Sequence, residues 1–151
     1  MRLDLSRLRP SEWITAGSAL ALLVCLLAIK WYRYAGGVSL NGWHGLTHVR
    51  WLAVVAIVAS LALAWLQATR RSPALPVTVS MIVTSLGGLL LLVLIYRVLI
   101  NAPASREGGS FIGLAAAAGI FFGGYASMRT EGISSKDEPA EIETVRLRGD
   151  S

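Results

Sequence analysis

Long apolar stretches alternate with short polar ones along this chain. Four segments are built mostly from Leu, Val, Ile, Ala and Gly, and their central parts hold no Asp, Glu, Lys, Arg or His. A helix of about 20 apolar residues spans the hydrocarbon core of a bilayer. The pattern therefore predicts four transmembrane helices, at about residues 13–30, 47–68, 77–100 and 111–128.

The connections between these segments are short and rich in Gly and Pro, so neighbouring helices should run antiparallel. We expect an all-α membrane protein, an up-down-up-down four-transmembrane-helix bundle that occupies residues 1–128 as one domain. Residues 129–151 form a polar cytoplasmic tail, expected to be disordered when alone. Within it, residues 142–147 alternate apolar and polar side chains and could add a strand to a partner's sheet.

Composition supports the membrane assignment. The 151 residues are 54% hydrophobic and only 15% charged, whereas soluble domains carry about a quarter charged residues. The net charge of +5 comes from basic residues that flank the apolar segments. That placement indicates contacts with the lipid bilayer rather than with nucleic acid, which we do not expect as a partner.

The basic residues also predict an orientation, because Lys and Arg accumulate on the cytoplasmic side. The side that holds both termini carries more of them: Arg2, Arg7, Arg9, Arg70, Arg71, Arg129, Lys136, Arg146 and Arg148. The other side carries Lys30, Arg33, Arg50, Arg97 and Arg106. We expect both termini in the cytoplasm.

Small residues recur at a spacing of four in each helix and predict close helix packing, within the bundle or with partners. The series are Gly17-Ala21-Cys25, Ala56-Ser60-Ala64, Thr84-Gly88 and Ala115-Gly119-Gly123. Each series is expected to lie on one face. Cys25, the only cysteine, is interpreted as a small packing residue.

His44 and His48 are four residues apart. If a helix begins near Trp43, they share a face and could hold a metal ion or an axial cofactor. No third ligand is close in the sequence. We therefore expect no metal and no cofactor, with His44 and His48 as weak candidates only.

Aromatic residues gather around the first connection, and amphipathic rings favour the head-group level of a bilayer. Arg97 can extend to the same interface and contact a lipid phosphate. A lipid or quinone head-group site framed by the aromatic rings is an alternative to a plain interfacial belt. The candidate lipid or interface contacts are Trp31, Tyr32, Tyr34, Trp43, Trp51 and Arg97.

The membrane segments lack the ionisable groups that proton-coupled transport needs, and Glu12 at the membrane edge is assigned to a helix start. No catalytic motif is present. We expect a non-enzymatic accessory, assembly or scaffold subunit that acts through association with other membrane proteins or itself. One alternative is a small-solute or lipid transporter or channel lined by Thr78, Thr84, Ser85 and Tyr125. The other is a membrane redox or metal-binding protein that uses His44 and His48.

Several short motifs carry a family likeness: residues 9–13 (RPSEW), 41–43 (NGW), 70–77 (RRSPALPV), 94–99 (LIYRVL) and 127–129 (SMR). With these motifs the chain resembles an uncharacterised family of small bacterial four-helix integral membrane proteins. The resemblance extends over most of the chain up to Met128. It implies a bacterial plasma-membrane location, but no activity and no site residues.

Overall fold

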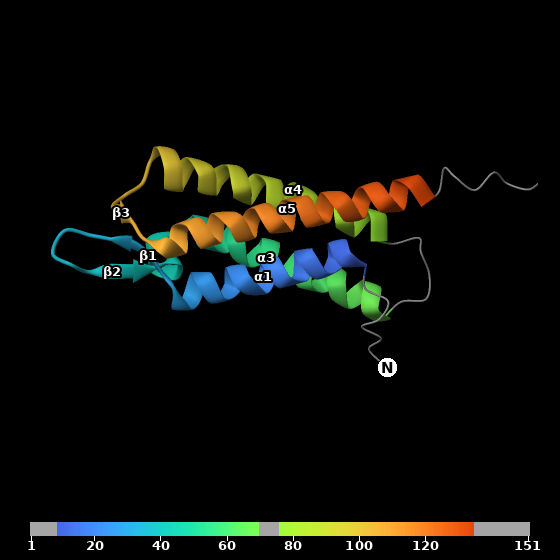
Figure 1. Ribbon diagram of the computed structural model, residues 1–151, viewed down its shortest axis with the longest axis horizontal. Coiled ribbons are helices and arrows are strands. Elements are labelled where there is room, and N and C mark those ends of the chain that lie inside the picture. Colours follow the sequence, from blue (N-terminus) through green and yellow to red (C-terminus); the bar gives the residue numbers. More distant parts are fainter. Residues whose placement is uncertain (1–8, 70–75, 135–151) are drawn as a thin grey trace, which may run out of the picture.

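Four long helices form an elongated bundle with a small β-sheet at one end (Figure 1). The computed structural model describes residues 9–69 and 76–134. The helices are α1 (Pro10–Ala28), α3 (Val49–Thr69), α4 (Pro76–Ile95), which continues into a π-helical turn η2 (Tyr96–Ile100), and α5 (Gly108–Ser134). Each holds a segment long and apolar enough to cross a membrane. The predicted four-helix bundle is confirmed, and the chain is a multi-pass membrane protein.

Three helix ends lie three or more residues from the predicted ones: the start of α1 and both ends of α5. α1 begins at Pro10, because proline fits the first turn of a helix and the Glu12 carboxylate accepts the Arg9 backbone N–H at 3.0 Å. α5 continues to Ser134 instead of ending at Met128. The first residues of the predicted tail are therefore helical, and the expected strand at 142–147 lies outside the described residues.

The helices close a ring in which each packs against two others. α5 lies between α1 and α4, and α3 completes the ring by packing against the same two helices. Large aliphatic side chains such as Leu22, Leu63, Leu90 and Ile120 are fully buried in its interior. α1 begins and α5 ends at the end of the bundle away from the sheet (Figure 1).

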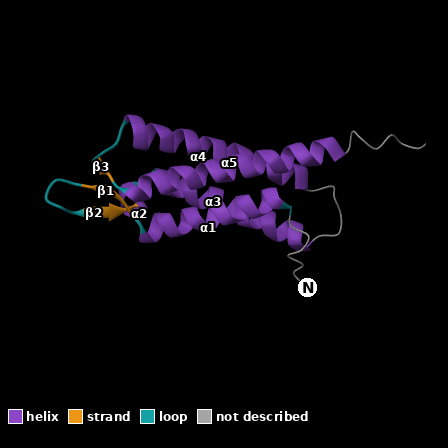
Figure 2. Ribbon diagram, viewed as in Figure 1, coloured by secondary structure: helices purple, strands orange, loops and turns teal. Residues whose placement is uncertain are grey.

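The first and third connections fold into a sheet, which corrects the expectation of plain loops (Figure 2). Strands β1 (Lys30–Arg33), β2 (Ser39–Asn41) and β3 (Ser105–Arg106) are antiparallel in the order β2-β1-β3, and a short helix α2 (Gly42–Gly45) follows β2. The hairpin turns at Gly36 and Gly37, whose φ angles of 94° and 81° suit glycine. The strands are too short for alternating polarity to reveal them.

The sheet is tied to the end of α1 through two side chains. The indole N–H of Trp31 donates to the Cys25 carbonyl at 2.9 Å, and the Asn41 amide donates to the Leu27 carbonyl at 2.8 Å. The last carbonyls of a helix have no partner within it. These two bonds therefore satisfy two of the terminal carbonyls of α1 and hold β1 and the end of β2 against the bundle.

Candidate functional site

Trp31 and Tyr32 of β1 are a pair of buried rings, here called the aromatic plug, where the sheet meets the helices. Both side chains are fully buried, so the expectation that they contact lipid is wrong. Glycines make room for them: a Cβ at Gly113 would meet the Trp31 ring, and a Cβ at Gly42 or Gly45 would lie 2.8 Å from Trp31 or Tyr32. The two rings of β1 therefore pack against both α2 and α5.

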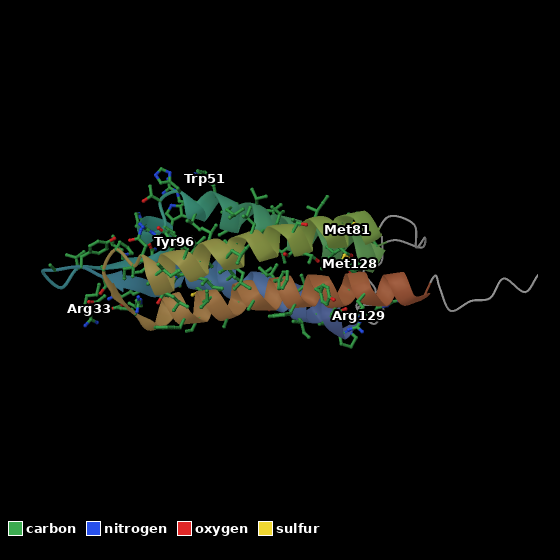
Figure 3. The ribbon with its side chains drawn as sticks, turned by 90° about the horizontal axis from the view of Figure 1, so that it is seen from above. Arg33, Trp51, Met81, Tyr96, Met128 and Arg129 are labelled. Carbon is green, nitrogen blue, oxygen red and sulfur yellow. The ribbon has the colours of Figure 1, made fainter. Side chains whose placement is uncertain are left out.

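The other aromatic candidates lie further out. Tyr34 and Trp43 are half-buried, and Trp51 is 59% exposed near the sheet end of the bundle (Figure 3). Tyr96 is also exposed near that end. Since rings with one polar atom favour the head-group level, their lipid contact stays a prediction.

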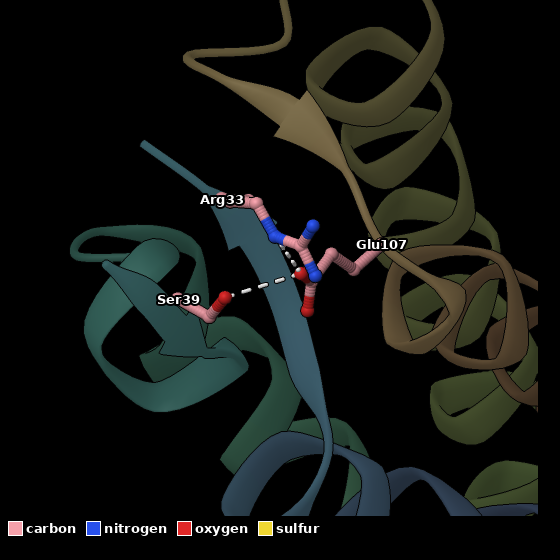
Figure 4. Close-up of polar contacts among 3 residues, drawn as sticks. All are labelled: Arg33, Ser39 and Glu107. Atoms are coloured by element: carbon pink, nitrogen blue, oxygen red, sulfur yellow. Dashed lines mark hydrogen bonds and ion pairs between the residues drawn. The ribbon is translucent and has the colours of Figure 1, made fainter. Parts of the chain in front are cut away.

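A polar junction connects the sheet to α5 through Arg33, Ser39 and Glu107 (Figure 4). The Arg33 Nε lies 2.7 Å from the Glu107 carboxylate, and the Ser39 hydroxyl donates to the same carboxylate oxygen at 3.1 Å. The Glu107 backbone N–H also donates to the Trp31 carbonyl at 2.9 Å. Sequence analysis missed Glu107, although it is the only acidic residue between Glu12 and Glu131.

His44 and His48 do not share a helix face, which corrects that expectation. α2 ends at Gly45 and α3 begins only at Val49, so the two histidines lie on separate elements. The His44 ring Nδ1 lies 2.7 Å from the Asn41 side-chain oxygen, which also accepts the His44 backbone N–H. In the part of the chain that the structure describes, no group of three His, Cys, Asp or Glu is placed to hold a metal ion.

Arg50, at the start of α3, contacts two indoles that also contact each other. Its guanidinium carbon is 5.2 Å from the Trp43 ring centroid and 5.6 Å from that of Trp51. The two rings meet edge to face, with centroids 6.0 Å apart. One Nη donates to the Trp43 carbonyl at 3.5 Å, while the buried Nε has no partner. We call these three residues the Trp43–Arg50–Trp51 cluster. In the sequence it is indicated only by spacing, since Arg50 and Trp51 follow Trp43 by seven and eight residues.

Arg97 is half-buried in η2, at the end of α4, and its backbone carbonyl accepts the Tyr32 hydroxyl at 3.4 Å. Burial raises the pKa of the Tyr32 phenol above its ordinary value. The positive charges of Arg97 and Arg106 oppose that rise, and Tyr34 adds to it. Arg97 therefore contacts the aromatic plug through its backbone.

The predicted packing residues divide into two groups. Ala56 and Ser60 are buried, and a Cβ on Gly88, Gly119 or Gly123 would press on a neighbouring helix. Gly17 differs, because it is exposed and a Cβ there would meet nothing within 4 Å.

The expectation that Gly17, Ala21 and Cys25 share one face is wrong. Gly17 and Ala21 point outward, whereas Cys25 is buried and its thiol donates to the Gly109 carbonyl at 3.0 Å. A step of four residues turns a helix by about 40° beyond a full circle, so a third member has left the face of the first. The packed face of α1 instead includes Thr15, Ala19 and Leu22.

The hydroxyl residues proposed to line a channel do not face one interior path. The Thr84 hydroxyl donates to the Ser80 carbonyl in its own helix at 2.7 Å, and Thr84 contacts the position of Gly124. Ser85 and Tyr125 are exposed on the outside of the bundle. The side chain of Thr78 lies outside the described residues.

No protein-family model, curated protein or solved structure matches the chain. The resemblance to small bacterial membrane proteins therefore stays a prediction.

Proposed function

We propose that this protein is a non-enzymatic accessory, assembly or scaffold subunit that binds other membrane proteins, or a second copy of itself, through the outward face of α1. The observation that supports this proposal most directly is that Gly17 is exposed, and that a Cβ there would meet no atom within 4 Å. A helix gains little from an exposed glycine, since glycine weakens helices by about 1 kcal/mol relative to alanine. A partner helix that approaches closely over Gly17 and Ala21 would offset that cost.

The packing of the bundle interior supports association over transport. Two buried hydroxyls bond within their own helices: Ser60 donates to the Ala56 carbonyl at 2.7 Å, and Thr15 donates to the Ser11 carbonyl at 2.9 Å. A third, on Ser127 of α5, shares a hydrogen bond with the Ser11 hydroxyl of α1 at 3.2 Å. Aliphatic side chains fill the space between the helices. A solute path needs polar groups that face a shared cavity, and these hydroxyls are already engaged.

The proposal includes a location in the bacterial plasma membrane, with both termini in the cytoplasm. The excess of Lys and Arg on the terminal side supports this orientation. Arg129 lies at that end of α5, away from the sheet (Figure 3). Reporter fusions after Ser151 and within the hairpin at Gly36 should report cytoplasmic and external locations, respectively; the reverse would contradict the orientation.

A quantitative pull-down tests the association. The tagged chain is purified from membranes in mild detergent, and co-purified proteins are measured by mass spectrometry, with light scattering for self-association. We expect a stoichiometric partner or a homo-oligomer that Gly17→Leu removes. The matched control is Ala62→Leu, which enlarges an exposed small residue on α3. A monomer without a stoichiometric partner, or equal loss in both variants, would contradict the proposal.

A further inference from the structure

The positive charge of the Arg50 guanidinium has no counterion among the residues that the structure describes. Within residues 9–69 and 76–134, no carboxylate pairs with Arg50, whereas Arg33 at the same end pairs with Glu107. Arg50 is half-buried, and its Nε is covered by protein and has no hydrogen-bond partner. A partly desolvated charge with an unmet donor gains more from an anionic partner than an exposed one does.

The two indoles position this charge at the surface of the bundle. Trp43 and Trp51 hold the guanidinium at 5.2 and 5.6 Å from their centroids, within the range of cation–π attraction. Trp51 is largely exposed at the start of a transmembrane helix, where indoles favour the boundary between head groups and acyl chains. The Trp43–Arg50–Trp51 cluster is therefore accessible to an amphiphile from the membrane.

The charge around the cluster favours an anion. The connections at the sheet end and the helix ends next to them hold one acidic residue, Glu107, which is already paired with Arg33. The basic residues in the same part of the chain are Lys30, Arg33, Arg50, Arg97 and Arg106. An anionic head group is therefore attracted to this end of the bundle over several ångströms before it meets Arg50.

We propose that the Trp43–Arg50–Trp51 cluster binds the phosphate of an anionic phospholipid. The planar guanidinium fork matches two phosphate oxygens, and the exposed indole of Trp51 packs on the glycerol and upper acyl chains. This site does not require helix association. It includes Trp43 and Trp51, two of the predicted lipid contacts, with Arg50 in place of Arg97.

Native mass spectrometry of the full-length protein with phosphatidylglycerol or phosphatidylcholine tests this site. We expect the wild type to retain phosphatidylglycerol preferentially and Arg50→Gln to weaken that binding about tenfold. Arg50→Lys should lose less, because it keeps the charge without the fork. The matched control is Arg106→Gln, which removes an exposed charge at the same end and should change the binding less than about twofold.

Equal losses in Arg50→Gln and Arg106→Gln, or none in Arg50→Gln, would overturn the site. Inorganic phosphate is tested in parallel without lipid. If millimolar phosphate displaces phosphatidylglycerol from the wild type but not from Arg50→Gln, the cluster binds free phosphate and the lipid assignment is wrong. Should Arg50→Gln fail to fold, Trp51→Leu replaces it, because an exposed side chain can be changed with little effect on folding. We expect Trp51→Leu to weaken phosphatidylglycerol binding about threefold. Unchanged binding would contradict the proposal.

Discussion

The Nε atom of Arg33 lies 2.7 Å from a carboxylate oxygen of Glu107, and this ion pair joins β1 to the residue that precedes α5. The same oxygen accepts the Ser39 hydroxyl from β2. Through its backbone N–H, Glu107 also holds the carbonyl of Trp31. One acidic residue therefore connects two strands, the aromatic plug and the start of a membrane helix.

Replacement of Glu107 should loosen this connection by a modest amount. Arg33 is 63% exposed and Glu107 16% exposed, so water screens the pair and Glu107→Gln should cost about 1 kcal/mol of unfolding free energy. The measurement is denaturant unfolding in detergent micelles. Arg33→Gln is the matched partner variant, and the double variant should lose less than the sum of both single losses. Fully additive losses would show that the pair is not coupled.

Because α5 approaches the aromatic plug closely, alanine at Gly113 and alanine at Gly17 should affect the stability of the protein differently. A Cβ on Gly113 would overlap the fully buried Trp31 ring, so Gly113→Ala should destabilise the protein by about 1–3 kcal/mol. Gly17→Ala meets open space and should leave the stability unchanged or raise it by up to about 1 kcal/mol. Thermal unfolding of both variants in the same detergent measures the difference. Similar effects would contradict the described packing of α5.

The buried phenol of Tyr32 predicts a loss of stability in alkali. Burial raises its pKa in the folded state, so the unfolded chain releases this proton at lower pH than the folded protein does. The stability contribution is complete below the ordinary pKa of about 10 and is lost as the pH rises above it. Unfolding measured between pH 8 and 11 should show a steeper decline for the wild type than for Tyr32→Phe. Parallel declines would contradict this role.

The four membrane spans could be predicted because uncharged stretches of sufficient length have few other stable environments. The burial of individual tryptophans could not. Trp31 and Trp51 both flank apolar segments, yet Trp31 is buried and Trp51 is exposed. The difference depends on the Cys25 carbonyl and on glycines from α2 and α5, which only the fold brings together.

The candidate sites were predicted less well than the spans, for a geometric reason. Spacing rules place residues on one helix but give neither its first residue nor its rotation in the bundle. His44 and His48 separate because α3 begins at Val49, and Gly17 points outward while Gly123 packs against Thr15. The contact between Arg50 and Trp43 depends on α2, which places the Trp43 ring centroid 5.2 Å from the guanidinium.

Photo-crosslinking in native membranes tests the central claim, association through the outward face of α1, most directly. A photoreactive amino acid replaces Gly17 in one variant and Ala62 in the other; both positions are exposed. We predict one discrete crosslinked product from position 17 and only diffuse products from position 62. No discrete product from position 17, or the same products from both positions, would contradict the account.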